Sequence, residues 1–321
     1  MEFAFELALC AHLERATDWV LARQLGGAVA APGSRVVDVV GVVPGPNFDG
    51  RTRITDRTIP PAVVEADIGV GESVPVTRAF DTRPDRARGL ADAGVDCGFL
   101  VEERRGGTRC VRRATRYPDD WVGELVAIEN KPDLGRPGDL RRQLRVDASL
   151  ALFDQVVLAT ESHVTGAHLN RIPEAVGVWR FDPETGDREV VREAGTLDAD
   201  DWGVEPLDEY PGRTDIAVVS PAAKVHKRRR IAERAYGKGW RTYEFPGCGN
   251  CVADADGRPY CEHFGRVVDP ASACAESCAG FEAADPAADE GEAASLRAER
   301  TPWVRDPPGV GSRQAGLDRF G

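Results

Sequence analysis

The chain has 321 residues and a mass of 34.7 kDa, which is enough for one or two domains with a hydrophobic core. Hydrophobic residues make up 42% of it, and this excludes a chain that is disordered throughout. No apolar run is long enough to cross a bilayer, because charged residues recur within the most apolar early stretch, residues 3–14. That stretch also lacks a basic start and a small-residue cleavage site, so we expect a cytoplasmic protein with no membrane partner.

The charge balance is unusual in kind as well as in size. Acidic residues outnumber basic ones by 53 to 41, the net charge is −12, and only Lys131, Lys224, Lys227 and Lys238 are lysines. This lysine-poor, carboxylate-rich composition is similar to that of proteins from salt-loving archaea, in which concentrated cations screen the self-repulsion. The acidity therefore reflects the solvent as readily as the ligand, and it does not exclude a nucleic-acid partner.

The first half of the chain alternates between periodic segments and an insertion. A helix is predicted over residues 2–23, followed by short strands over residues 28–31 and 35–43. Residues 44–118 are interpreted as an insertion with two short helices (residues 61–67 and 85–93) and a β-hairpin. That order is the order of a winged-helix unit. A surface excursion that ends in a hairpin is the interpretation that we favour.

The second half of the chain resumes the core. A strand over residues 124–128, a helix over residues 139–153 and a strand over residues 155–159 are predicted, then a hairpin over residues 175–181 and 188–193. Together these elements give an α/β core with a mixed sheet. The remaining segments are predicted to be a linker (residues 196–223), a basic helix with a cysteine-rich module (residues 224–281) and a disordered tail (residues 282–321).

Charged side chains stand in two apolar strands of this core. Alternation along a strand places Glu129 and Lys131 on one face and Asn130 on the other. Asp38 lies within a valine-rich strand, where a carboxylate is costly to bury unless it is paired or binds a cation. If the two strands are neighbours, Asp38, Glu129 and Lys131 converge. Two carboxylates can hold Mg²⁺ or Mn²⁺, and the lysine can help to neutralise the transition state of phosphodiester hydrolysis.

These residues resemble the PD-(D/E)XK nuclease superfamily, which has the restriction-endonuclease-like fold. Asp38 matches the first acidic residue of that family, and Glu129-Asn130-Lys131 matches its E-x-K. Glu6 matches the acidic residue of the family's first helix. The resemblance covers residues 1–43 and 119–195, and it implies a restriction-endonuclease-like core and a metal-dependent nuclease, with DNA as the expected substrate.

A further match is to the RecB-like members of the superfamily. Gln143, in the helix after the E-x-K, matches the glutamine of their QxxxY element. Asp147 stands where that element has tyrosine. The resemblance therefore implies a role in the site for Gln143 and leaves the RecB-like subgroup open.

Five of the eight cysteines lie in one C-terminal segment with the spacing C-x2-C-x9-C-x12-C-x3-C: Cys248, Cys251, Cys261, Cys274 and Cys278. In a chain with no secretory signal, such clustering favours metal over disulfides. Zn²⁺, with His263 as a further candidate ligand, and an iron–sulfur cluster both suit these thiols, and we favour zinc. Some RecB-like nucleases add an N-terminal cysteine to such a cluster, and Cys10 resembles it. A cysteine on an apolar helix is more often a small buried hydrophobe.

The segment from Lys224 to Arg241 is strongly basic and has aromatic residues interleaved, which suits phosphate contacts with base stacking. The candidate nucleic-acid contacts are Lys224, Lys227, Arg228, Arg229 and Arg230. A basic face that pairs with acidic residues elsewhere on the protein is the alternative.

Three functions follow from these observations. The favoured one is a metal-dependent nuclease. The others are a catalytically inactive nucleic-acid-binding protein with the same fold, and a metal-stapled interaction protein in which the E-x-K is coincidental. His163 and His168, which follow the last core strand, are assigned no catalytic role, and the sequence leaves the oligomeric state open.

Overall fold

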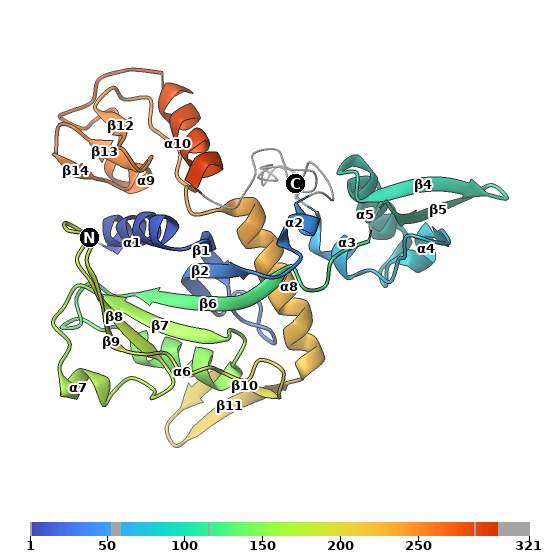
Figure 1. The fold of residues 1–321 in the computed structure, drawn as a ribbon, viewed down its shortest axis with the longest axis horizontal. Coiled ribbons are helices and arrows are strands. Elements are labelled where there is room, and N and C mark those ends of the chain that lie inside the picture. The colour runs from blue at the N-terminus through green and yellow to red at the C-terminus, as the bar shows by residue number, and fades with distance from the viewer. Residues whose placement is uncertain (1, 53–58, 115, 286, 301–321) are drawn as a thin grey trace.

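The centre of the protein is a six-stranded mixed sheet with the strand order β1-β2-β6-β7-β8-β9 (Figure 1). The structure is a computed structural model and describes residues 2–52, 59–114, 116–285 and 287–300. The pairs β6–β7 and β7–β8 are parallel, and the other pairs are antiparallel. These strands are β1 (Val20–Gly26), β2 (Val36–Pro44), β6 (Val122–Asn130), β7 (Gln155–Thr160), β8 (Gly177–Phe181) and β9 (Arg188–Arg192). The predicted α/β core with a mixed sheet is confirmed.

Helices cover both faces of this sheet because successive strand residues point to opposite sides and both sides are apolar. Helix α1 (Glu2–Ala16) packs on one face, against residues that include Leu21 and Val39. Helices α6 (Leu140–Leu150) and α8 (Pro221–Lys238) pack on the other, against Val40 and Ala127. Within the described ranges no helix is both long and apolar enough to span a membrane.

The first helix is shorter than predicted, and strand β1 begins where the helix was expected to continue. The hydroxyl of Thr17 donates to the carbonyl of Leu13 at 2.7 Å and closes the last turn. Val20 then pairs with Val42 in the antiparallel ladder with β2. An apolar run such as residues 19–21 fits a helix or a strand equally well, so pairing with β2 decides its conformation.

Residues 28–31, predicted to be a strand, form a loop instead. The backbone N–H groups of Val29, Ala30 and Ala31 donate to the buried carboxylate of Glu205, which competes with strand pairing. Glu205 belongs to a β-hairpin of β10 (Gly203–Tyr210) and β11 (Arg213–Val219). This hairpin lies in residues 196–223, so the predicted linker is wrong. Ser149 of α6 donates to the carbonyl of Val204 at 2.9 Å and holds the hairpin on the core.

The insertion leaves the sheet between neighbouring strands β2 and β6 and projects away from it (Figure 1). The two predicted helices and the hairpin are present, and a further short strand, β3, pairs with β5. The two ends of the insertion lie together, since the N–H of Gly45 donates to the carbonyl of Trp121 at 2.8 Å. The elements are α2 (Phe48–Arg51), α3 (Pro61–Glu65), β3 (Val74–Pro75), α4 (Val76–Ala79), α5 (Pro84–Asp96), β4 (Leu100–Arg105) and β5 (Thr108–Arg113).

The C-terminal module is a small sheet beside α1, on the side away from the central sheet (Figure 1). Its elements are β12 (Cys251–Ala253), β13 (Pro259–Cys261), β14 (Arg266–Val267), α9 (Pro270–Ala273) and α10 (Ala287–Arg300). Helix α10 lies in the segment predicted to be a disordered tail, and that prediction is wrong there. Arg297 donates to the carbonyl of Tyr236 at 2.9 Å and Arg300 to Asp256 at 2.7 Å, so α10 joins α8 to the module. Residues 301–321 lie outside the described residues.

The short helix α7 (Gly166–Leu169) begins with a capping box between Thr165 and His168. The backbone N–H of Thr165 donates to Nδ1 of His168 at 3.3 Å. This capping contact gives His168 a structural role.

A buried ion pair fixes the insertion on the core. Arg51 of α2 donates to Glu233 of α8 (Nε to Oε1, 2.8 Å), and the hydroxyl of Tyr117 donates to the same carboxylate. Arg51 is 0% and Glu233 2% exposed. The pair therefore carries its charges inside the protein, where each depends on the other.

We expect Glu233→Ala to lower the free energy of unfolding by about 3–5 kcal/mol, because it leaves the Arg51 guanidinium buried without its carboxylate partner. Urea denaturation at constant KCl concentration measures the change. The matched control is Asp119→Ala, which removes the exposed partner of Arg229 and should cost less than about 1 kcal/mol. Similar losses in the two variants would contradict the role of the buried pair.

Candidate functional site

Asp38 of β2 and Glu129 of β6 stand opposite each other in the central antiparallel pair, one position beyond Val39 and Ile128. The backbone N–H of Asn130 donates to Oδ2 of Asp38 at 3.0 Å and holds that carboxylate against the end of β6. The expectation that the two strands are neighbours is confirmed. Pairing of β2 with β6 thus brings together two acids that the whole insertion separates along the chain.

A buried guanidinium holds Glu129 in place. Arg35, immediately before β2, donates to Glu129 and to both carboxylate oxygens of Asp147 on α6, at 3.0 Å from Nε and 2.6 Å from Nη2. Exposed fractions are 5% for Arg35 and 1% for each acid. Sequence reasoning assigned neither Arg35 nor Asp147 to the site. The signal for Asp147 was its position on the apolar face of α6, three residues after Leu144.

Gln143, which the resemblance implied for the site, lies half-buried on α6 one turn before Asp147. Asp147, one turn further along the helix, is the residue that reaches Glu129 through Arg35. Asp147, the position at which this chain departs from the QxxxY element, is therefore the residue of α6 that shares the Arg35 guanidinium with Glu129.

On the α1 side of the sheet, Glu6 is 4% exposed and pairs with Arg23. The side-chain amide of Asn130 donates to Glu6, and Nε2 of Gln24 lies 3.4 Å from Glu6 Oε2 and 3.5 Å from Asp38 Oδ1. Gln24 has a φ of 55°, in the left-handed region that residues other than glycine rarely adopt and that is enriched at functional sites. Gln24 was not predicted from the sequence because a glutamine within a strand gives no local indication of a positive φ or of contact with two distant carboxylates.

The cluster carries an excess of negative charge. Four carboxyl groups (Asp38, Glu129, Asp147 and Glu6) face two guanidinium groups (Arg35 and Arg23), so four negative charges against two positive ones leave −2 when all four acids are ionised, as a bound cation would favour. Burial raises the pKa of Glu129 to about 8, Asp38 adds to the rise, and Arg35 opposes it. Burial likewise raises the pKa of Asp38, of Asp147 and of Glu6.

Asn130 contributes a buried acceptor to the same cluster. Its carboxamide oxygen Oδ1 is buried and has no hydrogen-bond partner among the described residues. A buried acceptor without a donor is costly. Together with the charge of −2, it makes the cluster suited to a cation.

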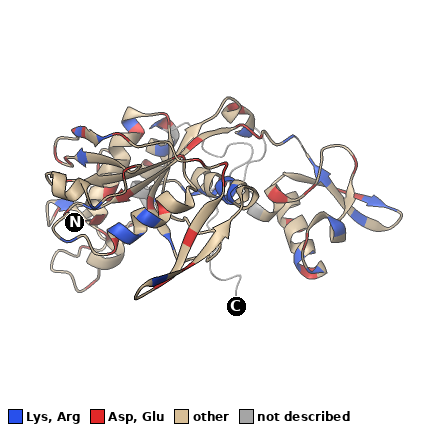
Figure 2. Ribbon diagram, turned by 90° about the horizontal axis from the view of Figure 1, so that it is seen from below, with Lys and Arg blue, Asp and Glu red and all other residues tan. Residues whose placement is uncertain are grey.

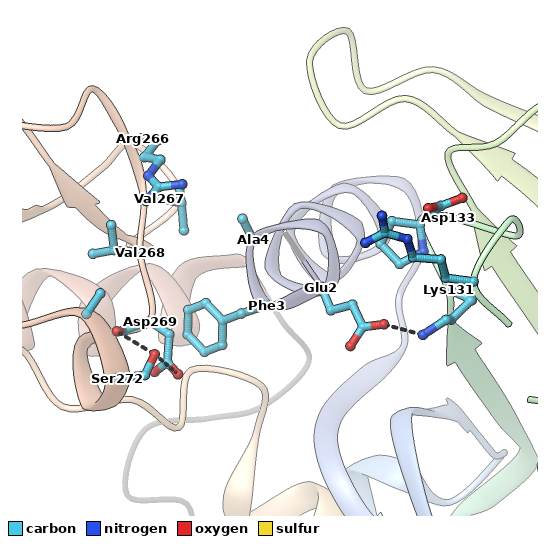
Figure 3. A pocket seen from close by; sticks show the side chains of 13 residues that line it. Glu2, Phe3, Ala4, Lys131, Asp133, Arg266, Val267, Val268, Asp269 and Ser272 are labelled. Atoms are coloured by element: carbon cyan, nitrogen blue, oxygen red, sulfur yellow. Dashed lines mark hydrogen bonds and ion pairs between the residues drawn. The ribbon is translucent and has the colours of Figure 1, made fainter. Parts of the chain in front are cut away.

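Lys131 lies one residue beyond β6, and its ammonium group pairs with Glu2 of α1 at 2.5 Å (Figure 3). Strand alternation predicts Lys131 on the same face as Glu129, but β6 ends at Asn130 and Lys131 contacts α1 instead. With Arg136 and Arg266 it lines a cavity of about 570 Å³ between α1, the loop after β6 and the C-terminal module (Figure 3). The lysine therefore faces a space that can hold a ligand.

The five clustered cysteines all line one cavity of about 10 Å³ in the C-terminal module: Cys248, Cys251, Cys261, Cys274 and Cys278. Cys251 and Cys261 are direct partners across β12 and β13. Burial raises the pKa of Cys251 to about 12, and the neighbouring Cys274 adds to the rise. As the side chains are placed, no three His, Cys, Asp or Glu groups in the described ranges converge to hold a metal ion. This applies to the cysteines and to the carboxylate cluster alike.

The two additional ligands considered for the cysteine site lie elsewhere. His263 is exposed, packs edge-on against Phe264 with ring centroids 4.8 Å apart, and does not line the cavity. Cys10 is 0% exposed in the apolar core between α1 and the central sheet, and burial raises its pKa. The interpretation of Cys10 as a distant ligand is therefore wrong in this structure, because its surroundings are those of a small buried hydrophobe.

The five basic residues predicted to contact nucleic acid lie on α8. Lys224 is fully buried, and its ammonium group donates to two backbone carbonyls. Arg228, Arg229 and Arg230 each pair with a carboxylate. Lys227 has no hydrogen bond or ion pair among the residues that the structure describes. Most of the basic charge of α8 therefore stabilises the fold, and elsewhere basic and acidic residues are interspersed along the ribbon (Figure 2).

The raised pKa of Glu129 predicts a pH-dependent stability. Because that pKa rises from 4.5 to about 8, the folded state binds a proton that the unfolded state releases. This contribution is complete below pH 4.5 and is lost as the pH rises through about 8. In EDTA, wild-type protein is therefore expected to lose stability relative to Glu129→Gln across this interval. Urea denaturation of both proteins measures it, and a difference that stays constant with pH would contradict the assignment.

The chain matches the model of a family described as "Family of unknown function (DUF5787)" over residues 20–283. No curated protein and no solved structure matches it. The matched residues run from β1 to the cysteine-rich module, so they include Asp38, Glu129 and the five cysteines. The chain therefore belongs to the DUF5787 family.

Proposed function

We propose that the protein is a metal-dependent nuclease that hydrolyses phosphodiester bonds in DNA. The observation that carries the proposal is the placement of Asp38 opposite Glu129 in neighbouring central strands, with Lys131 immediately after β6. The order of elements α1, β1, β2, β6, α6 and β7 supports it, since it is the order that the resemblance to the restriction-endonuclease-like fold implies.

The carboxylate cluster fits a divalent cation. Asp38 and Glu129 would hold Mg²⁺ or Mn²⁺, with the partnerless oxygen of Asn130 as a neutral candidate ligand. A hard cation prefers such oxygen donors, and a charge of +2 would neutralise the cluster. When bound, such an ion polarises a phosphodiester and lowers the pKa of a coordinated water.

The chain's own residues have separate roles in this proposal. Lys131 binds the phosphate that enters the cavity and stabilises the negative charge that develops on it. Gln24 and the backbone N–H of Asn130 orient Asp38. Arg35 orients Glu129 and supplies its counter-charge.

One observation favours a second candidate, a nucleic-acid-binding protein without turnover. The Arg35 guanidinium bridges Glu129 and Asp147, so a permanent cation already neutralises two of the acids. In an inactive protein of this fold, such an arginine would replace the metal. The assay below separates the two functions.

We expect wild-type protein to cleave DNA with Mg²⁺ or Mn²⁺ and Asp38→Asn and Lys131→Ala to lose about 10²- to 10³-fold in rate, since each removes charge stabilisation from the transition state. Gel assays on single- and double-stranded DNA at high KCl measure the rate. The matched control is Glu124→Gln, an exposed acid at the opposite end of β6, which should cut normally. Full activity in Lys131→Ala contradicts the site. Binding of DNA without cleavage by wild-type protein supports the inactive alternative.

We also propose that the cysteine-rich module holds a metal ion, with zinc favoured over an iron–sulfur cluster. Five thiol-bearing residues surround a cavity of about 10 Å³, close to the volume that one water-sized sphere occupies. Thiolates at these spacings are the ligands that structural zinc sites use. The ion would staple β12 and β13 to the loop after α9.

Purified protein is expected to contain about one zinc ion per chain. Cys251→Ser should lose the metal and melt at a lower temperature, because binding to a structural site is linked to folding. Elemental analysis and visible absorption, which detects an iron–sulfur cluster, identify the metal. Cys110→Ser, a buried cysteine of the insertion, is the control and should keep the metal. Folded wild-type protein without metal would overturn the proposal.

A further inference from the structure

A second large groove lies beside α8, on one face of the central sheet, whereas the cavity at Lys131 lies beside α1, which covers the other face. Its volume is about 720 Å³, and it is bounded by α8, by β1 and the loop that follows it, and by helices α3 and α5 of the insertion. The groove is thus formed jointly by the core and the insertion. It is lined by Leu25, Gly26, Ala28, Val29, Pro32, Pro60, Ala62, Glu65, Arg86, Leu90, Ala223, His226, Lys227, Arg230, Ile231 and Arg234.

The charge of this groove is opposite to that of the chain. Among the described residues, Arg86, Lys227, Arg230 and Arg234 line it against a single acid, Glu65, in a protein whose net charge is −12. Glu65 is already paired with Arg230 at 2.5 Å. Arg86, Lys227 and Arg234 form no hydrogen bond or ion pair within the part of the chain that the structure describes. Three cations therefore face the groove without a hydrogen-bonded or ion-paired partner among the described residues.

Lys227 is the least solvated of these cations. It is half-buried, and burial, with Arg234 and Arg230 nearby, lowers its pKa, while the carboxylate of Glu205, which already accepts from three backbone N–H groups, opposes the shift. Elsewhere on α8, Arg228 and Arg229 are paired with carboxylates. A half-buried ammonium group among like charges is costly unless an anion compensates it. The unpaired state of Lys227 therefore indicates a ligand with negative charge.

The groove is close to the carboxylate cluster. A β-carbon at Gly26 would lie 3.7 Å from Nζ of Lys227 and 4.0 Å from the carbonyl oxygen of Arg35. Arg35 is the residue that holds Glu129. The groove therefore borders Arg35, the residue that orients one of the proposed catalytic acids.

We propose that this groove binds the sugar–phosphate backbone of a nucleic acid, through Lys227, Arg234 and Arg86, at a site separate from the one that cleaves it. The proposal rests on the proposed nuclease function for the identity of the anion. No Trp, Tyr or Phe lines the groove within the described part of the chain, so we expect contacts to the sugar–phosphate backbone and binding that is independent of sequence. At molar salt the screening length is about 3 Å, so only cations in direct contact with phosphate contribute to the affinity. A groove allows such direct contacts.

Binding of a fluorescent oligonucleotide in EDTA, where cleavage is blocked, tests the groove. The double variant Lys227→Gln/Arg234→Gln should bind about tenfold more weakly and reduce the slope of log K against log salt by about 2, roughly one for each lost phosphate contact. The control is Arg180→Gln/Arg213→Gln, which removes the same charge from two exposed residues outside the groove. It should change affinity less than about twofold. Circular dichroism at each salt concentration verifies the fold of every variant.

Equal loss of affinity in the two double variants overturns the proposal, because net charge alone then explains binding. Equal displacement of the oligonucleotide by polyglutamate of matched charge also overturns it, since it would indicate an acidic protein as the ligand. The outcome is distinguishable from failure of the nuclease proposal. If wild-type protein never cuts but the groove variant alone binds weakly, the groove stands. If wild-type protein cuts and the groove variant binds normally, the groove fails and the nuclease stands.

Discussion

The guanidinium group of Arg35 joins three elements at the centre of the protein, because it reaches Glu129 on β6 and Asp147 on α6 from the start of β2. All three groups are buried, and removing one would leave an uncompensated charge inside, at a cost of several kcal/mol. Away from this point, apolar faces hold the sheet to its helices. At the end of the sheet that carries Glu129, ion pairs hold the sheet to α6 instead. The geometry of the proposed site therefore depends on Arg35.

The few lysines of the chain occupy positions where a compact donor is needed. Lys224 donates to two buried carbonyls, and Lys238 donates to the carbonyls of Arg23 and Gln24 at the end of β1. An ammonium group can direct its three donors to separate acceptors, whereas the planar guanidinium suits paired carboxylate oxygens. Lys131 and Lys227 are the lysines that face cavities. The avoidance of lysine elsewhere therefore makes its placement informative about both structure and ligands.

Much of the core could be predicted from sequence, since β2, β6, α6 and β7 carry clear periodicity, and the opposition of Asp38 to Glu129 followed from their strands being neighbours. The failures have one physical cause, which is that tertiary partners decide between local alternatives. Pairing with β2 turned residues 19–21 into strand, and Glu205 captured the backbone of residues 29–31. The role of Arg35 could not be predicted because its partners, Glu129 and Asp147, are distant in sequence. The hairpin β10–β11 was not predicted because exposed apolar residues such as Ile216 interrupt the alternation of buried apolar and exposed polar residues along its strands.

The insertion between β2 and β6 has a consequence for how the protein folds. The pair that carries Asp38 and Glu129 forms only after the chain has closed over residues 44–118, and contacts of such long sequence separation slow folding. The contact between Gly45 and Trp121 brings the ends of that segment together. If the insertion collapses first, the loop that must close between β2 and β6 is effectively shorter. Closing it then costs less conformational entropy. We therefore expect β2 to pair with β6 after the insertion has collapsed, so that a segment which contributes none of the four buried acids determines when they come together.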